Sequence, residues 1–253
     1  ALEQLEDRGF TPEEVEDLWA ESGDEYFLRE KPEDIVWHTE AMAQHYDKDS
    51  PLVLVRPSSL VEVENATQIF IHARNRDYLF SVVAAALEHL DLSVHDARVY
   101  NATDGMSMDT FYVLGADGRS IAQDRDRCDY IVRHLRDEIS AAEQYPEIVK
   151  RRTPRQIRFF SVPTETRMSI DPVKQVSVLE VASPDRPGLL ARIGRIFFEY
   201  GVELQAAKIA TLGERVEDVF FLTDKEQQPL RDEALCEDIQ AAIRKELDEQ
   251  AAA

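Results

Sequence analysis

Residues 182–190 read Ala-Ser-Pro-Asp-Arg-Pro-Gly-Leu-Leu and carry groups that suit the binding of a small zwitterion. Gly188 stands where an apolar strand pattern gives way to a helical pattern. The start of a helix presents unpaired backbone N–H groups, which favour anions. Asp185 offers a carboxylate that can face an ammonium group. The spacing therefore predicts capture of a free amino acid, with the backbone of Gly188 and Leu189 donating to its carboxylate.

The same residues also suit a turn with no ligand. Pro187 presets the first turn of a helix, and Gly188 permits tight packing. A connection from a strand to a helix favours both residues for these structural reasons alone. Taken from the residues only, ligand binding and plain helix capping both remain open.

The elements around this turn occur twice in the chain. The apolar pattern of residues 69–90 returns about 110 residues later, at 179–200, with the same helical spacing. The strands that follow share Asp-x-Phe, at 109–111 and 218–220. Each repeat ends in a charged helix, in which Cys128 and Cys236 hold equivalent places. That equivalence indicates a shared half-buried position for the two cysteines.

The order strand, helix, strand, strand, helix, strand predicts an α+β protein with two ferredoxin-like (βαββαβ) domains in tandem. No strand pattern follows the last helix, so we expect an earlier strand to complete each sheet edge. Residues 60–63 and 166–170 are the candidates, each after a strand marked by proline, at 52–57 and 157–163. The expected division is a short helical connector at 1–50, a first domain at 51–154 and a second at 155–253. Within the connector, Thr11-Pro12-Glu13-Glu14 predicts a capping box, and Lys31-Pro32 predicts the start of another helix.

Three segments carry a resemblance to known families. Asp-Arg-Pro-Gly-Leu-Leu at 185–190 resembles the ACT domain, a small regulatory module. Ala-Thr-Leu-Gly-Glu-Arg-Val-Glu-Asp-Val-Phe at 210–220 is similar to the C-terminal part of bacterial bifunctional uridylyltransferase/uridylyl-removing enzymes, as is Tyr-Phe-Leu-Arg at 26–29 with Trp37-His38-Thr39. That family modifies the PII nitrogen-signalling protein. The likeness covers nearly the whole chain and implies tandem ACT domains behind a connector that follows an HD-type hydrolase domain.

The resemblance implies a regulatory role for the chain. The family's enzyme transfers UMP from UTP to PII when glutamine is scarce and removes it when glutamine is plentiful. This portion would bind glutamine and bias the two activities, with PII and the enzyme's own catalytic domains as partners. UTP and Mg²⁺ would belong to those catalytic domains, and no catalytic residue is expected here. ACT ligands usually lie where two ACT units meet, so the other repeat or a second chain would supply part of the site. The expected effector-binding residues are Asp185, Arg186, Pro187, Gly188, Leu189, Gln205 and Lys208.

The first repeat departs from this motif at its equivalent turn, Asn75-Arg76-Asp77-Tyr78. Tyr78 fills the space that Gly188 leaves open. Asp77 suits the positive end of a helix but repels a carboxylate. We therefore expect the first repeat to be structural, or to hold the effector in another pose. Asn75, Arg76 and Asp77 are its secondary candidates.

Composition excludes several classes of function. The chain has 50 acidic and 29 basic residues, a net charge of −21, which argues against binding nucleic acid or anionic membranes. No apolar run approaches the ~18 residues of a membrane helix. Two cysteines provide neither a disulfide framework nor metal-ligand spacing, and His95-Asp96 lies on an expected strand whose alternate residues point to opposite faces. We expect a cytoplasmic chain without a metal site, able to form a homodimer through its ACT sheets.

Two other functions stay open at this stage. One is a stand-alone tandem-ACT amino-acid sensor, or the regulatory end of an amino-acid biosynthetic enzyme; the connector at 26–29 argues against it. The other is a structural dimerisation module that binds no ligand. If the sensor interpretation is right, Gly188→Val should abolish the response to the ligand while costing little stability.

Overall fold

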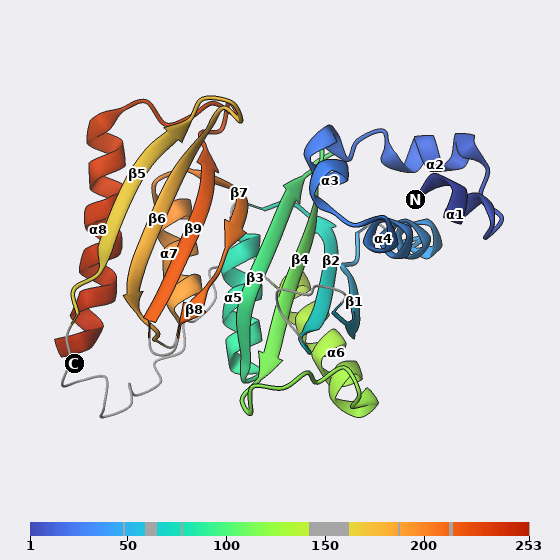
Figure 1. Ribbon diagram of the computed structural model, residues 1–253, viewed down its shortest axis with the longest axis horizontal. Helices are drawn as coiled ribbons and strands as arrows, with labels where there is room; N and C mark the ends of the chain where they lie inside the picture. The colour runs from blue at the N-terminus through green and yellow to red at the C-terminus, as the bar shows by residue number, and fades with distance from the viewer. Residues whose placement is uncertain are drawn as a thin grey trace.

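The computed structural model describes residues 1–47, 49–58, 65–76, 78–141, 162–186, 188–212 and 215–252. Over these ranges the strands form a nine-stranded sheet (Figure 1). The order of its main strands is β1-β2-β4-β3-β7-β9-β6-β5, with the short β8 paired to β9. Within the described part of the chain, no helix is both long enough and apolar enough to cross a membrane.

Four helices form the connector: α1 (Leu2–Glu6), α2 (Pro12–Trp19), α3 (Gly23–Arg29) and α4 (Pro32–Gln44). The predicted capping box is confirmed at α2. The Thr11 hydroxyl accepts from the Glu14 amide at 3.3 Å, and the Glu14 carboxylate accepts from the Thr11 amide at 2.8 Å. Lys31 is the N-cap of α4, with proline at its first position, as the sequence indicates.

Each repeat begins with two strands and a helix and continues with two long strands and a helix; the second repeat adds the short strand β8. The first comprises β1 (Leu52–Pro57), β2 (Thr67–Arg74), α5 (Leu79–His89), β3 (Leu92–Asn101), β4 (Met106–Gly115) and α6 (Arg125–Ala141). The second comprises β5 (Glu165–Asp171), β6 (Val176–Pro184), α7 (Leu189–Glu199), β7 (Glu203–Lys208), β8 (Thr211–Leu212), β9 (Arg215–Thr223) and α8 (Glu233–Ala252). The predicted α+β class is confirmed, and each sheet edge is completed by a strand that comes before the repeat's first helix.

The prediction of the edge strands was wrong in one respect. β5 covers the predicted strand at 166–170 and pairs antiparallel with β6. Its counterpart in the first repeat is β1, which pairs antiparallel with β2. Residues 60–63 and 157–161 lie outside the described residues, as does the proposed boundary near 155. Formation of a homodimer through the ACT sheets stays a prediction.

The two repeats join edge to edge. β3 and β7 pair antiparallel at Ala97 and Ala207, so the two sheets become one. Behind this seam α5 packs against α7, and both contribute to one continuous apolar core with α6 and α8. Small residues bring the two helices close: the Ser81 hydroxyl donates to the Ala191 carbonyl at 2.9 Å, and Gly194 lies against Ser81.

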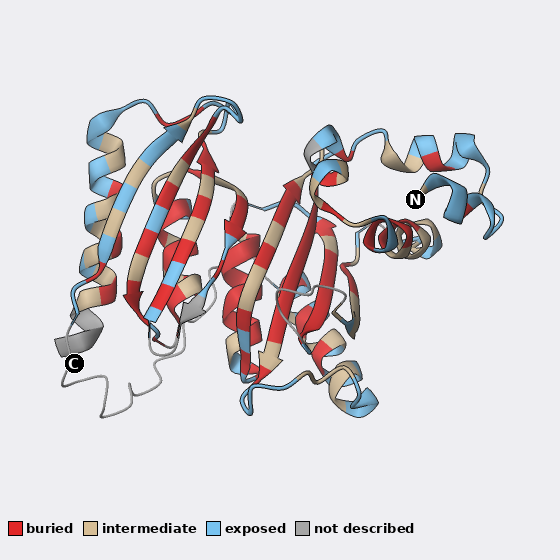
Figure 2. Ribbon diagram, in the orientation of Figure 1, coloured by how far each residue is buried: buried red, intermediate tan, exposed pale blue. Residues whose placement is uncertain are grey.

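Among the described residues, the connector helices cover the opposite face of the sheet mainly in the first repeat. Phe70 of β2 packs there against Trp37 and His38 of α4. β4 is consequently buried along nearly its whole length, whereas β9 alternates between buried and exposed residues near its start (Figure 2). Cys128 and Cys236 are both half-buried on the last helices of their repeats, as predicted.

Candidate functional site

A hollow lies between the repeats beside the turn at 185–189. We call it the second-turn hollow. The second repeat contributes this turn, the start of α7 and part of β9, and the first repeat contributes the end of α5 and the start of β3. The cavity volume is about 370 Å³, within the range of roughly 300–1,000 Å³ that is usual for small-molecule sites. The chain therefore has room for one amino acid at the seam of its two repeats.

Gly188 forms the rim of this hollow at the start of α7. Its φ of +75° is left-handed, a conformation that glycine adopts without strain. The Leu189 amide donates to the Arg186 carbonyl at 3.3 Å, whereas none of the described residues accepts from the Gly188 amide. Of the two predicted main-chain donors, only Gly188 is thus available within the described structure. The left-handed φ also contradicts the expectation that valine at 188 would cost little stability.

Asp185 stands on the rim opposite the first repeat. Partial burial raises the pKa of its carboxyl group, and His95 of β3 acts in the opposite direction. Burial in turn lowers the pKa of His95, which Asp185 partly offsets. An acid of the second repeat and a histidine of the first therefore interact electrostatically across the seam.

Asp218 of β9 lies beneath the hollow and is 1% exposed. Its Oδ1 accepts from the Ala210 amide at 3.3 Å. Burial, together with nearby Asp185, raises the pKa of Asp218 to about 7. The sequence showed Asp218 only as part of the repeated Asp-x-Phe. A charged residue at the same place in an apolar strand of both repeats was the signal that could have marked it as a site residue.

The structure does not bring all the predicted residues to the hollow. Arg186 lines it through part of its length, but its guanidinium donates to the Leu247 carbonyl of α8. Gln205 donates to the Thr223 hydroxyl at 2.8 Å, and Lys208 is exposed on β7. Neither Gln205 nor Lys208 lines the hollow. Pro187 lies outside the described residues.

The first repeat has an equivalent hollow, lined by Asn75 and Arg76 and by the end of α7. Its volume is about 50 Å³, which is space for only ~3–5 water molecules. Tyr78 packs its ring edge-on against Phe198, with 5.9 Å between the ring centres. Asp77 lies outside the described residues. The difference in volume favours the second repeat as the place for a ligand.

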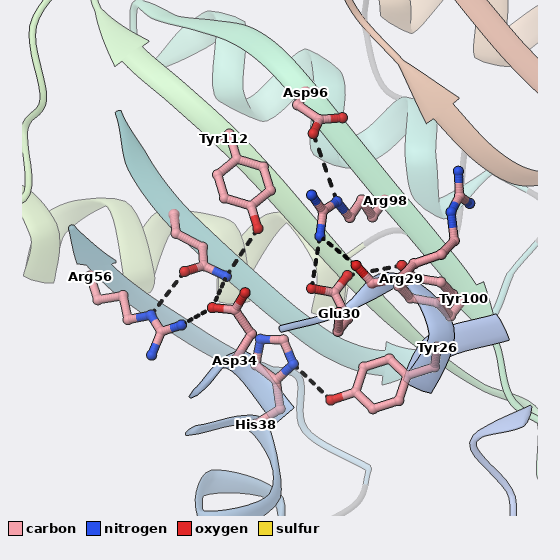
Figure 3. Close-up of polar contacts among 11 residues, drawn as sticks. Tyr26, Arg29, Glu30, Asp34, His38, Arg56, Asp96, Arg98, Tyr100 and Tyr112 are labelled. Carbon is pink, nitrogen blue, oxygen red and sulfur yellow. Dashed lines mark hydrogen bonds and ion pairs between the residues drawn. The ribbon is translucent and has the colours of Figure 1, made fainter. Parts of the chain in front are cut away.

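A buried polar network ties the connector to the first repeat (Figure 3). Glu30, at the end of α3, accepts from Arg98 at 3.1 Å and from the Tyr100 hydroxyl at 2.9 Å. Asp34, on α4, accepts from Arg56 and from the Gln68 amide. Breaking one partner of such a pair leaves a charge in a dry environment, which is strongly destabilising. The network therefore fixes the connector on the sheet.

The connector also reaches the second repeat and carries a buried aromatic pair. The Arg29 guanidinium lies over the Phe221 ring of β9, 5.6 Å from its centre. The Tyr26 hydroxyl and His38 Nδ1 are 2.9 Å apart, and burial lowers the pKa of His38 well below its usual value. His38 is therefore neutral where it stacks on Phe70.

Comparison with known proteins gives consistent matches along the chain. Residues 1–41 match a family described as the fifth domain of the uridylyltransferase GlnD, and residues 177–240 match the ACT domain family. The chain is 47% identical, over 98% of its length, to the bifunctional uridylyltransferase/uridylyl-removing enzyme of Pseudomonas aeruginosa (strain LESB58). The chain belongs to this enzyme family. The corresponding enzyme of Azotobacter vinelandii (strain DJ) is also 47% identical over 98% of the chain.

The chain spans 27% of the Pseudomonas enzyme and 28% of the Azotobacter enzyme, and it matches the C-terminal portion of the family. Within this portion of a uridylyltransferase/uridylyl-removing enzyme, the fifth-domain match covers α1 to α3 and most of α4. A solved structure, the ethanolamine utilization protein EutL from Leptotrichia buccalis, covers 81% of this chain and 96% of its own at 10% identity. Its TM-score of 0.27 is too low to support any argument.

Proposed function

We propose that the chain is the effector-binding portion of a bifunctional uridylyltransferase/uridylyl-removing enzyme, and that it binds glutamine in the second-turn hollow. The observation that carries this proposal is the hollow itself, which combines an available amide at Gly188 with acidic side chains. A free amino acid needs both kinds of partner at short range. The carboxylate of glutamine would lie at Gly188 and the start of α7, where the helix dipole favours an anion.

The rest of the enzyme would supply the chemistry. PII would be its protein substrate, and UTP and Mg²⁺ would bind in its catalytic domains. Among the described residues, no three or more His, Cys, Asp or Glu side chains gather so that they could hold a metal ion. The contribution that we propose for this portion of the chain is regulatory.

Regulation requires that glutamine binds the two states of the enzyme with different affinity. A tenfold difference corresponds to ~1.4 kcal/mol, and the coupling is reciprocal. The hollow suits such a role because its walls come from both repeats, so a ligand inside it contacts both. Movement of one repeat against the other would then change the affinity.

Titration calorimetry of the chain with L-glutamine tests the proposal, with the other amino acids as a panel. We expect one glutamine per chain, and weaker binding when Asp185 is replaced by asparagine. In the whole enzyme, the same variant should need more glutamine to shift the balance from uridylylation to removal. Absence of heat and of any thermal shift with glutamine would exclude the proposal.

A further inference from the structure

Two buried aspartates occupy equivalent places in the repeats but have different surroundings. Asp109 of β4 and Asp218 of β9 are each 1% exposed. The Ser107 hydroxyl donates to Asp109. The residue two positions before Asp218 is Val216, which has no hydroxyl to offer. The second repeat therefore keeps the buried acid and lacks its internal partner.

Asp218 is left with an unpaired oxygen. Its Oδ1 accepts only the 3.3 Å bond from Ala210, and its Oδ2 is buried with no hydrogen-bond partner within the described part of the chain. Native proteins pair nearly all buried polar atoms, so such an exception calls for a physical reason. The space beside each acid supplies one, because the cavity is about 370 Å³ at Asp218 and about 50 Å³ at Asp109.

We propose that Asp218 is the ion-pair partner of the ammonium group of the amino-acid effector in the second-turn hollow. The inference rests on the proposed function and adds a residue that the turn motif does not contain. A ligand ammonium would supply to Asp218 the donors that Ser107 supplies to Asp109. Gly188 and Asp218 would then hold the two charged ends of one amino acid.

The charges around the hollow support a cation at this place. Glu88 at the end of α5 and Asp91 after it line the hollow from the first repeat, and Asp185 lines it from the second. His95 of β3 interacts electrostatically with Asp185. The Arg186 guanidinium is directed to the Leu247 carbonyl. The charged groups of the elements packed here are thus mainly acidic, and they favour an ammonium group over a second anion.

A proton must leave Asp218 when the ammonium binds. Burial raises the pKa of Asp218 to about 7, so roughly half of the molecules carry the proton at neutral pH. An ammonium partner favours the carboxylate, and the proton passes to solvent. Binding at pH 7 should therefore release roughly half a proton per ligand, and affinity should rise about tenfold between pH 6 and pH 8. The sign is upward because the ligand-free state binds more protons.

Calorimetry with L-glutamine and with glutaramate, which lacks the α-ammonium group, tests the assignment. The wild-type chain should bind glutamine at least tenfold more tightly than glutaramate. Asp218→Asn should reduce this preference to below threefold and abolish proton release, measured in two buffers of different ionisation enthalpy. Asp109→Asn is the matched control and should keep both the preference and the proton release.

The outcomes separate the two proposals. If the wild-type chain binds glutaramate as tightly as glutamine, or if Asp218→Asn keeps the preference for glutamine, the role of Asp218 is refuted and the amino-acid site stands. If no amino acid binds the wild-type chain, both are refuted. The comparison of glutamine with glutaramate needs no variant, so it tests for a partner of the ammonium group even if Asp218→Asn fails to fold.

Discussion

Replacing Gly194 by alanine would place one methyl group where α5 and α7 cross. An alanine Cβ at this position would lie 2.4 Å from the Ser81 hydroxyl oxygen, 3.2 Å from a ring carbon of Phe80 and 3.3 Å from the Ser81 Cβ. Non-bonded carbon atoms prefer separations of about 3.5–4.0 Å. Either the two helices must move apart, or Ser81 must rotate away from the Ala191 carbonyl that it bonds.

The expected net effect is a loss of stability. Forcing a methyl group into a packed core costs about 1–3 kcal/mol, while alanine gains up to about 1 kcal/mol over glycine in a helix interior. We therefore expect Gly194→Ala to destabilise the chain by ~1–2 kcal/mol. For a protein of this size, each kcal/mol lowers Tm by about 2–4 °C. Glutamine affinity should fall as well, because the same crossing shapes the hollow.

Thermal and urea unfolding of four proteins measure the effect: wild type, Gly194→Ala, Ser81→Ala and the double variant. Ser81→Ala removes the nearest clashing atom, so the double variant should lose less than the two single losses added together. Ala84→Gly, at the place in α5 equivalent to Gly194, controls for helix propensity. Full stability of Gly194→Ala, or strict additivity in the double variant, would contradict the close crossing described here.

Three further expectations concern other parts of the molecule. Burial raises the pKa of Asp109 to about 7, so the folded state binds more protons than the unfolded state between about pH 4 and 7; stability should fall as pH rises through this window, and Asp109→Asn should weaken the fall in urea titrations. Gly188→Val should lower the stability by at least ~1–2 kcal/mol because of the left-handed φ, and Gly188→Asn by less, as thermal melts will show. Glu30→Gln should remove the nearest carboxylate from Arg98, so amide hydrogen exchange in α3 and α4 should become faster while exchange in α8 stays unchanged. If the variant and the wild type exchange at the same rate in α3 and α4, the network does not hold the connector.

Local patterns made much of the fold predictable. Thr11 and Glu14 form their capping box within four residues. Gly188 adopts the left-handed backbone conformation at the start of α7, which is typical of glycine and could be predicted from the residue itself. The repeat was visible because apolar residues recur at matching positions. The edge strand of the second repeat was predicted at 166–170, where β5 lies, but β1 and not 60–63 forms the edge beside β2 in the first repeat. A strand's place depends on its pairing partner and not on its own composition.

The site was harder to predict because its residues meet through packing. Arg186 bonds Leu247, which lies 61 residues away, and no local signal reveals that contact. A register shift between Leu204 and Ala206 alters which way β7 presents its side chains, and Gln205 lies at that shift. The distinction between Asp109 and Asp218 depends on cavity size and on one neighbouring hydroxyl, which become clear only in three dimensions.

Strand β3 connects two places that the chain order keeps apart. His95 interacts electrostatically with Asp185, which lines the hollow, and three residues later Arg98 donates to Glu30 of the connector. A strand rises about 3.3 Å per residue, so ~10 Å of backbone separates the two contacts. A shift of this strand would therefore move both contacts. If the hollow binds an effector as proposed, β3 would connect that site to the connector through three residues of one strand.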